Sequence, residues 1–335
     1  MVRQIQLAHG NGGKDTEVLL HELFYRYFGN PTLLHSLDAA CFSINGRVAY
    51  TTDSFVVKPL FFSGGDIGKL AVCGTINDLV VSGAKPLYLS CGFILEEGLE
   101  IELLERIVES MSSACKAANV LIVTGDTKVV EKGSVDKIFI NTSGIGIVND
   151  GYEQKQIGEG DRILITGGIG EHGTTIGVER YRLNVKGDIR SDCMSLDRIL
   201  DALVKNNHLK AIKLMKDPTR GGVATVLNEI AQYANIGVHL MEKDIPIRQE
   251  IAGVNQILGL EPLYLANEGR MLLVVEEGAC DDILHSIRSC DGCEGAAVIG
   301  RFTVATNGPI VLIENQFGGK RILPLLEGEM LPRIC

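Results

Sequence analysis

Apolar residues follow two different spacings along the first 150 residues. A repeat of three to four positions predicts three helices, at 16–28, 67–82 and 100–118. Short apolar runs bounded by glycine, proline or polar residues are typical of strands, and they occur at 86–93, 120–123 and 138–148. The segment TGDTKVV at 124–130 is expected to form a loop before the last of these strands. Residues 1–150 therefore predict one α/β unit.

The second half mixes strands and helices in a less regular order. Strands are expected at 162–166 and near Val238, Leu272 and Val298, with helices after GGIGEHG, from Ser195 and after DPTRGG. Strand and helix do not alternate strictly, which favours two α+β domains over one doubly wound sheet. The predicted domains are 1–150 and 160–313, joined by a polar linker. Residues 314–335 lose the periodicity and predict a flexible, extended tail.

Composition narrows the function classes without choosing one. The chain of 335 residues carries 32 Lys and Arg against 42 Asp and Glu, a net charge of −10 with no basic cluster, which argues against nucleic-acid binding. No apolar run approaches the roughly 20 residues of a membrane span. We therefore expect a soluble, cytoplasmic protein. The 39 glycines indicate tight turns and backbone close to a ligand, and nine cysteines in so large a chain are expected to be reduced thiols.

Four aspartates stand beside small or hydroxylated residues in separate segments. They are Asp53 in TTDS, Asp78 in TINDLVVSGA, Asp126 in TGDTK and Asp217 in DPTRGG. Carboxylates from separate loops are ligands that Mg²⁺ prefers, and a helix that opens on Gly221 and Gly222 offers free N–H groups to phosphates. Each aspartate taken alone is equally compatible with a helix cap or a turn. The set predicts a Mg²⁺–phosphate site, and the absence of GxxxxGK[ST] excludes a P-loop.

Two further features lie at the ends of the chain. HGNGG at 9–13 is either a flap over a nucleotide or a disordered terminus. Cys335 is the last residue, so it is not the cysteine of a prenylation box, which stands fourth from the end. It follows a segment stiffened by Pro332, and a thiol there is either accidental or a reactive group that reaches into a site and out to a partner. His172 in GEHG is left without a role.

These segments together resemble a known family, the HypE hydrogenase maturation factors, which are carbamoyl dehydratases. The resemblance covers essentially the whole chain. It depends on LAHGNGG, TDS, PLFFSGGDIGKLAVCGTINDLVVSGA, YLSCGFILEEG, VTGDTKVV, DPTRGG, NEG and the terminal PRIC. The terminal PRIC is the most specific of these. The middle motifs also occur in aminoimidazole ribonucleotide synthetases, selenide water dikinases and thiamine-phosphate kinases, which bind ATP on a similar frame.

The resemblance implies an α+β homodimer in which the two N-terminal domains pair into a β-barrel, with ATP bound at the dimer-related cleft and a C-terminal α+β sandwich behind it. A carbamoyltransferase, HypF, would load a carbamoyl group onto the sulfur of Cys335. ATP-dependent dehydration would turn it into a thiocyanate. The cyanide would pass to iron held by a HypC–HypD complex, for a nickel–iron hydrogenase.

The resemblance also implies roles for individual residues. Asp53, Asp78, Asp126 and Asp217 would hold Mg²⁺ and, with Thr127, Gly221 and Gly222, the ATP, while His9, Gly10, Gly12 and Gly13 would close over the nucleotide. Glu268 in NEG and Lys128 are candidates for proton removal and carbamoyl orientation, and either could take the proton. Two other functions compete with this one: an ATP-dependent small-molecule kinase or synthetase, and a non-catalytic scaffold that binds nucleotide and recruits partners through its tail. The kinase or synthetase has no use for a terminal cysteine.

Overall fold

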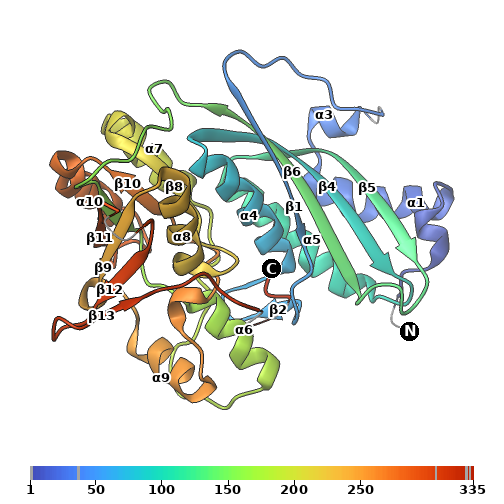
Figure 1. The fold of residues 1–335 in the computed structure, drawn as a ribbon. Coiled ribbons are helices and arrows are strands. Elements are labelled where there is room, and N and C mark those ends of the chain that lie inside the picture. The colour runs from blue at the N-terminus through green and yellow to red at the C-terminus, as the bar shows by residue number, and fades with distance from the viewer. Residues whose placement is uncertain (1–2, 36–37, 306–307, 329–330, 332) are drawn as a thin grey trace.

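A computed structural model describes residues 3–35, 38–305, 308–328, 331 and 333–335. Two large sheets organise these residues into two halves (Figure 1). A sheet of four strands in the order β1-β6-β4-β5 belongs to the first half, and a sheet of seven in the order β13-β12-β9-β11-β7-β10-β8 belongs to the second. The chain is therefore mixed α+β, as the sequence predicted.

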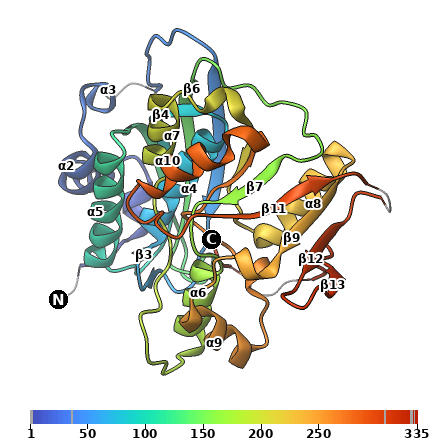
Figure 2. The same ribbon diagram turned by 90° about the vertical axis from the view of Figure 1, so that its left-hand side faces the viewer.

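Helices cover one face of the first sheet. Its strands are β1 (Val48–Phe55), β6 (Ile138–Val148), β4 (Ala84–Glu96) and β5 (Leu121–Val130), of which only the β4–β5 pair is parallel. Helices α4 (Ile67–Val81) and α5 (Ile101–Ala117) lie behind it (Figures 1 and 2). On the other face apolar side chains stay exposed, among them Tyr50 at 67% and Ile94 at 42%.

Helix α4 is the central helix of the molecule. The Asp66 side chain caps its N-terminus by accepting from the N–H groups of Gly68 and Lys69, at 2.7 and 3.1 Å. Almost all of its residues are buried, as expected for a helix that is apolar all round. A Cβ at Gly68 would lie 2.4 Å from the carbonyl oxygen of Ile107, so glycine allows α4 and α5 to pack closely.

Short helices flank the β5 edge of the sheet. The predicted helix at 16–28 is present, interrupted by one π-helical turn. The segments are η1 (Leu7–Gly10), α1 (Lys14–Leu19), η2 (Leu20–Phe24), α2 (Tyr25–Phe28) and α3 (Pro31–Leu34). Phe24 of this group contacts Phe93 of β4, with ring centroids 4.9 Å apart, and so ties the helices to the sheet. A two-stranded hairpin, β2 (Phe61–Phe62) with β3 (Gly65–Asp66), precedes α4.

The second sheet is covered on both faces. Its strands are β7 (Arg162–Ile165), β8 (Ile212–Lys216), β9 (Gly237–Met241), β10 (Leu272–Val275), β11 (Ala297–Thr303), β12 (Val311–Glu314) and β13 (Lys320–Ile322). Helix α8 (Gly222–Ala234) packs on one face, and α7 (Asp197–Lys205) with α10 (Cys280–Arg288) on the other. Helices α6 (Glu171–Tyr181) and α9 (Gln249–Leu258) lie together beyond it (Figure 1). The core beneath α7 and α10 continues into the first half through α4.

One expectation about local structure was wrong. Residues 124–130 are not a loop, because β5 runs through them, paired with β4 from Tyr88↔Leu121 to Glu96↔Val130. Gly125 and Asp126 disfavour a strand locally, but the hydrogen bonds to β4 outweigh that preference. Within the segment predicted as an extended tail, β13 pairs with β12. None of the described helices is both long and apolar enough to cross a membrane.

Candidate active site at the junction of the two halves

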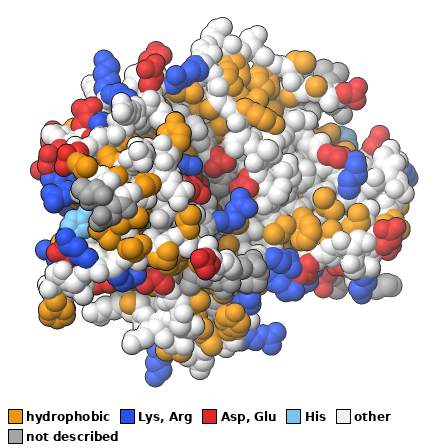
Figure 3. All heavy atoms as spheres, viewed as in Figure 1, with side chains coloured by type: hydrophobic (Ala, Val, Ile, Leu, Met, Phe, Trp, Pro, Cys, Tyr) orange, Lys and Arg blue, Asp and Glu red, His pale blue; other side chains and the backbone are white. Residues whose placement is uncertain are grey.

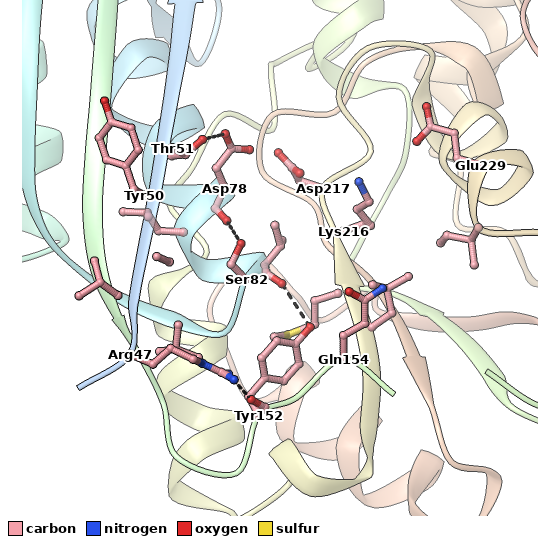
Figure 4. A pocket seen from close by; sticks show the side chains of 18 of the residues that line it. Arg47, Tyr50, Thr51, Asp78, Ser82, Tyr152, Gln154, Lys216, Asp217 and Glu229 are labelled. Carbon is pink, nitrogen blue, oxygen red and sulfur yellow. Dashed lines mark hydrogen bonds between the residues drawn. The ribbon is translucent and has the colours of Figure 1, made fainter. Parts of the chain in front are cut away.

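Three of the four predicted metal-binding aspartates meet between the two sheets. Asp53 lies on β1, Asp78 on α4, and Asp217 directly follows β8. The Asp53 carboxylate points toward α4, 3.8 Å from where a Cβ of Gly74 would stand, and Thr51 donates a hydrogen bond of 2.7 Å to Asp78. Asp78 and Asp217 border a cleft of about 840 Å³ (Figure 4). Acidic side chains gather in the hollow between the halves (Figure 3).

These carboxylates repel one another. Burial, and then the charge of Asp78, raises the pKa of Asp217 to about 7. Burial also raises the pKa values of Asp53 and Asp78, while the nearby Arg220 acts in the opposite direction on both. Among the described residues, no three His, Cys, Asp or Glu side chains form a preassembled metal site. The acidic oxygens nevertheless fit a divalent cation, because a cation would remove their repulsion.

Glu268 is the buried acid of the site. Glu268 is only 3% exposed, and its Oε1 has no hydrogen-bond partner among the described residues. Burial and the charges of Asp192 and Asp217 raise the pKa of Glu268 well above its usual value. Asp192 holds the backbone in place by accepting from the N–H groups of Glu268 and Gly269, both at 3.2 Å. A buried acid with a free oxygen is poised for proton transfer.

The end of the chain lies in the same site. Val56 donates its backbone N–H to the carbonyl oxygen of Cys335 at 3.1 Å, and Lys58 donates to that of Arg333 at 3.2 Å. The end of the chain at Cys335 therefore lies beside the segment that follows β1, between the two halves (Figures 1 and 2). Burial, and then the charge of Glu268, raises the pKa of the Cys335 thiol to about 12. The thiol and the acid thus share one site; Pro332 lies outside the described residues.

Asp126 and Lys128 lie elsewhere in the chain. Both are on β5, where Lys128 Nζ stands 2.8 Å from Asp126 Oδ1 and both side chains are more than 60% exposed. Strands β1 and β5 are opposite edges of the sheet, three strand spacings or about 14 Å apart. Asp126 also falls in the register row of Ser54, on the open face, whereas Asp53 points to α4. A single chain does not bring Asp126 to the other three aspartates.

The N-terminal glycines lie beside β5 rather than in the cleft. Gly10 and Gly12 line a cavity of about 240 Å³ together with Asp126, Thr127 and Lys128. A Cβ at Gly10 would stand 2.7 Å from the Val129 nitrogen. His9 accepts a hydrogen bond of 2.8 Å from the Gln6 N–H through its Nδ1, and Gly13 precedes α1. These residues form a second group with Asp126, Thr127 and Lys128.

The DPTRGG segment contributes more than its aspartate. Gly221 and Gly222 both have positive φ, +74° and +61°, and open α8. A Cβ at Gly222 would lie 2.5 Å from the Leu263 carbonyl oxygen. Gly221 borders a cavity of about 340 Å³ next to Cys335, and so does Arg220. The sequence reasoning missed Arg220 although it lies inside a quoted motif; it likewise missed Asp192, for which the sequence holds no local signal.

Curated relatives match this chain over its full length. It is 45% identical over 334 residues to carbamoyl dehydratase HypE of Bradyrhizobium diazoefficiens. The match covers 99% of this chain and 96% of the relative. It is 43% identical over 342 residues to carbamoyl dehydratase HypE of Escherichia coli K12, covering 100% of both. The chain belongs to the HypE family of carbamoyl dehydratases. The resemblance inferred from the motifs is confirmed.

Family models and solved structures agree with this membership. The models for the N-terminal and C-terminal domains of AIR synthase related proteins match residues 36–148 and 158–312. A crystal structure of a HypE in complex with ATP has a TM-score of 0.94 at 45% identity, covering 98% of this chain and 99% of that one. A crystal structure of a HypE–HypF complex has a TM-score of 0.80 at 43% identity, covering 92% of this chain and 99% of that one. Thiamine monophosphate kinase from Aquifex aeolicus, at 15% identity and a TM-score of 0.61, shares the fold.

Proposed function

We propose that this chain dehydrates a carbamoyl group carried on the Cys335 sulfur to a thiocyanate, consuming ATP, and so supplies cyanide for the iron of a nickel–iron hydrogenase. The observation that carries the proposal is the position of Cys335, which shares a site with Glu268, Asp53 and Arg220. HypE relatives named carbamoyl dehydratases, and a HypE solved with ATP, support the same reaction.

The chemistry requires an oxygen to leave and two protons to be removed. Transfer of the γ-phosphoryl group to the carbamoyl oxygen turns a poor leaving group into phosphate. As the carbon–oxygen bond breaks, the carbamoyl nitrogen loses both of its protons, one to a base and one to the departing phosphate, which leaves S–C≡N with ADP and hydrogen phosphate. A base must stand within hydrogen-bond reach of that nitrogen. Glu268 is the candidate within this chain, because its Oε1 is free to accept a proton and burial raises its pKa, which makes its carboxylate a stronger base.

Asp53, Asp78 and Asp217 would hold Mg²⁺, and Gly221 and Gly222 would face the phosphates of ATP from the start of α8. Bound Mg²⁺ would neutralise the charge that moves with the phosphoryl group. Arg220 offsets the acidic charge of the site, since it opposes the raised pKa values of Asp53, Asp78 and Cys335.

A homodimer explains why the predicted site residues fall into two groups. In our proposal the open faces of two β1-β6-β4-β5 sheets pair into a β-barrel, which would cover exposed apolar residues such as Tyr50 and Ile94. Asp126, Thr127, Lys128 and the 9–13 segment of one chain would then complete the ATP site of the other. Lys128 would orient the carbamoyl group or the phosphates from the partner, and Glu268 would take the proton.

Partners and location follow from the same proposal. HypF would load the carbamoyl group, which the solved HypE–HypF complex of relatives supports. A HypC–HypD complex would accept the cyanide, and the exchange would take place in the cytoplasm. For this exchange residues 314–335 would have to move as a tail relative to domains at 1–150 and 160–313.

The test is the mass of the C-terminal peptide after incubation with HypF, carbamoyl phosphate, Mg²⁺ and ATP. We expect one carbamoyl adduct on Cys335 that loses one water only when ATP is present. The Cys335→Ala chain is the control and should show neither change. An unmodified Cys335 in a chain that still consumes ATP on a small molecule would overturn the proposal in favour of a metabolite kinase.

A further inference from the structure

His172, near the start of α6, contacts the tail directly. It is fully buried, with 0% of its surface exposed. Its Nε2 lies 2.7 Å from the carbonyl oxygen of Ile334, and its Nδ1 lies 2.8 Å from the hydroxyl of Ser191. The ring also packs in a T-shaped arrangement with Phe62, with centroids 5.4 Å apart. Both nitrogens are therefore used, and one of them is used by the residue next to Cys335.

The carbonyl of Ile334 decides which nitrogen of His172 carries the proton. A carbonyl oxygen can only accept, so Nε2 carries the hydrogen and donates it to Ile334. In the neutral ring Nδ1 then accepts from the hydroxyl of Ser191, whose oxygen accepts from the backbone N–H of Cys193 at 3.0 Å. Burial lowers the pKa of His172 to about 4, which keeps the ring neutral and this arrangement intact near neutral pH.

His172 binds the tail at a carbonyl that the segment after β1 does not reach. The carbonyl oxygens of Arg333 and Cys335 accept from the backbone N–H groups of Lys58 and Val56. The chain turns at Arg333, whose φ is +52°, and the carbonyl oxygen of Ile334 is bound by His172 instead. Arg180 also donates to the Arg333 carbonyl oxygen, at 2.9 Å. All three carbonyl oxygens at the end of the chain are therefore bound, and His172 binds the one next to Cys335.

The loop that orients His172 also holds the buried acid. Ser191 orients the imidazole, and the adjacent Asp192 accepts from the backbone N–H groups of Glu268 and Gly269. The side chain of Asn77 on α4 joins the same segments, donating to the carbonyl oxygens of Met194 and Glu268 at 3.0 and 3.2 Å. One short loop thus sets the positions of both Cys335 and Glu268.

We propose that His172, oriented by Ser191, is a positioning residue that locks the tail into the site and places the Cys335 sulfur relative to Glu268. Its role in holding the tail depends on geometry alone. Its consequence for dehydration rests on the proposed function.

The experiment measures how fast iodoacetamide alkylates Cys335 in the full chain, by mass of the C-terminal peptide. A docked thiol is shielded and hard to ionise, so release of the tail raises the rate. We expect His172→Leu to raise it about tenfold, equivalent to about 1.4 kcal/mol in the docking equilibrium. His172→Gln, which keeps a donor, should stay within about threefold of wild type. Exposed Cys41 is the internal reference for reagent strength.

His208→Leu is the matched control. His208 also bonds a serine through Nε2, Ser286 at 2.8 Å, but it lies between α7 and α10. Its loss should leave the Cys335 rate unchanged. An unchanged rate in His172→Leu, or an equal rise in His208→Leu, overturns the proposal. Should the buried Cys91 and Cys115 react in His172→Leu, that variant has unfolded, and Ser191→Ala decides instead: a rise of roughly threefold supports the lock, and none overturns it.

Dehydration of carbamoylated Cys335 gives the second readout. His172→Leu should slow the ATP-dependent loss of water without changing the KM for ATP, and His172→Gln should restore most of the rate. If alkylation responds as expected while neither wild type nor any variant dehydrates the carbamoyl group, the role of His172 in holding the tail stands and the proposed function fails. If dehydration proceeds while alkylation never changes, the lock fails and the proposed function stands.

Discussion

The two groups of candidate site residues differ in burial and in how their charges are balanced within one chain. At the junction of the halves, Asp53, Asp78, Asp217 and Glu268 are buried to varying degrees. Burial raises the pKa of every one of them, and nearby carboxylates add to the rise at Asp53, Asp217 and Glu268. On β5, Asp126 is exposed and already paired with Lys128. The first group carries unbalanced negative charge, which a bound cation or a proton would neutralise. The second is balanced, and it is suited to act on something outside its own chain.

Replacing Glu268 tests the buried group most directly and should have the largest effect. We expect Glu268→Gln to slow dehydration by about 10²–10⁴-fold, the range typical of a lost general base, with carbamoylation of Cys335 intact. Single-turnover mass analysis of the C-terminal peptide separates these two steps. Glu294→Gln, in the turn after Gly292, is the control and should react as wild type does. A dehydrating Glu268→Gln chain would remove Glu268 from the mechanism.

Mixed subunits test whether the β5 group serves the partner. Asp78→Asn and Lys128→Ala chains should each have little activity alone. In a shared-site dimer, a mixed dimer holds one site with both changes and one with neither. Random pairing makes half of the dimers mixed, so coexpression should restore about a quarter of the wild-type activity. Activity no higher than that of the separate variants would mean that each chain completes its own site.

The pH dependence of stability tests the repulsion at Asp217. Its pKa of about 7 in the folded chain lies above the usual 3.8, so the folded chain holds this proton more tightly and stability falls as pH rises from about 4 to about 7. Asp217→Asn removes that part of the slope. At pH 8 we expect its Tm to exceed that of wild type by roughly 2–4 °C, equivalent to about 1 kcal/mol in a mid-sized domain.

Calorimetry at pH 4.5 and pH 8 measures this difference. At pH 4.5 the two chains should unfold at similar temperatures, and at pH 8 Mg²⁺ with ATP should narrow the gap, because a cation relieves the repulsion in wild type only. A gap that is the same at both pH values would contradict the assignment.

Breaking the exposed Asp126–Lys128 ion pair should have the smallest effect, a small change in stability. Exposed ion pairs contribute about 0–1 kcal/mol, so Lys128→Ala should change the Tm by no more than about 2 °C even though it impairs activity. Lys58→Ala, which breaks another exposed pair with Asp136, is the comparison. A large loss of stability in Lys128→Ala alone would show that β5 depends on this pair, and the contrast between the two groups would then be lost.

Much of the local structure could be predicted from neighbouring residues. The spacing of apolar positions predicted α4 and α5 to within about one residue at each end, because a helix depends on contacts three and four residues apart. The terminal PRIC and the glycine-rich motifs led to the correct family. The errors lie where distant pairing prevails: Gly125 and Asp126 favour a loop, but β4 holds them in a strand.

Only the tertiary structure separated the four aspartates into three partly buried ones at the junction and an exposed one on β5. Side chains that look equivalent in the motifs point to opposite faces of one sheet, since a shift of one residue along a strand reverses the side chain. The same is true of Arg220, Asp192 and His172, whose partners lie far away in the sequence; His172 bonds Ile334 162 residues later. The amino-acid sequence determined most of the elements and the family, and it put a cysteine at the end of the chain. The packing of the two halves decided which residues that end meets, because burial and charge at the junction come from segments that no local pattern connects.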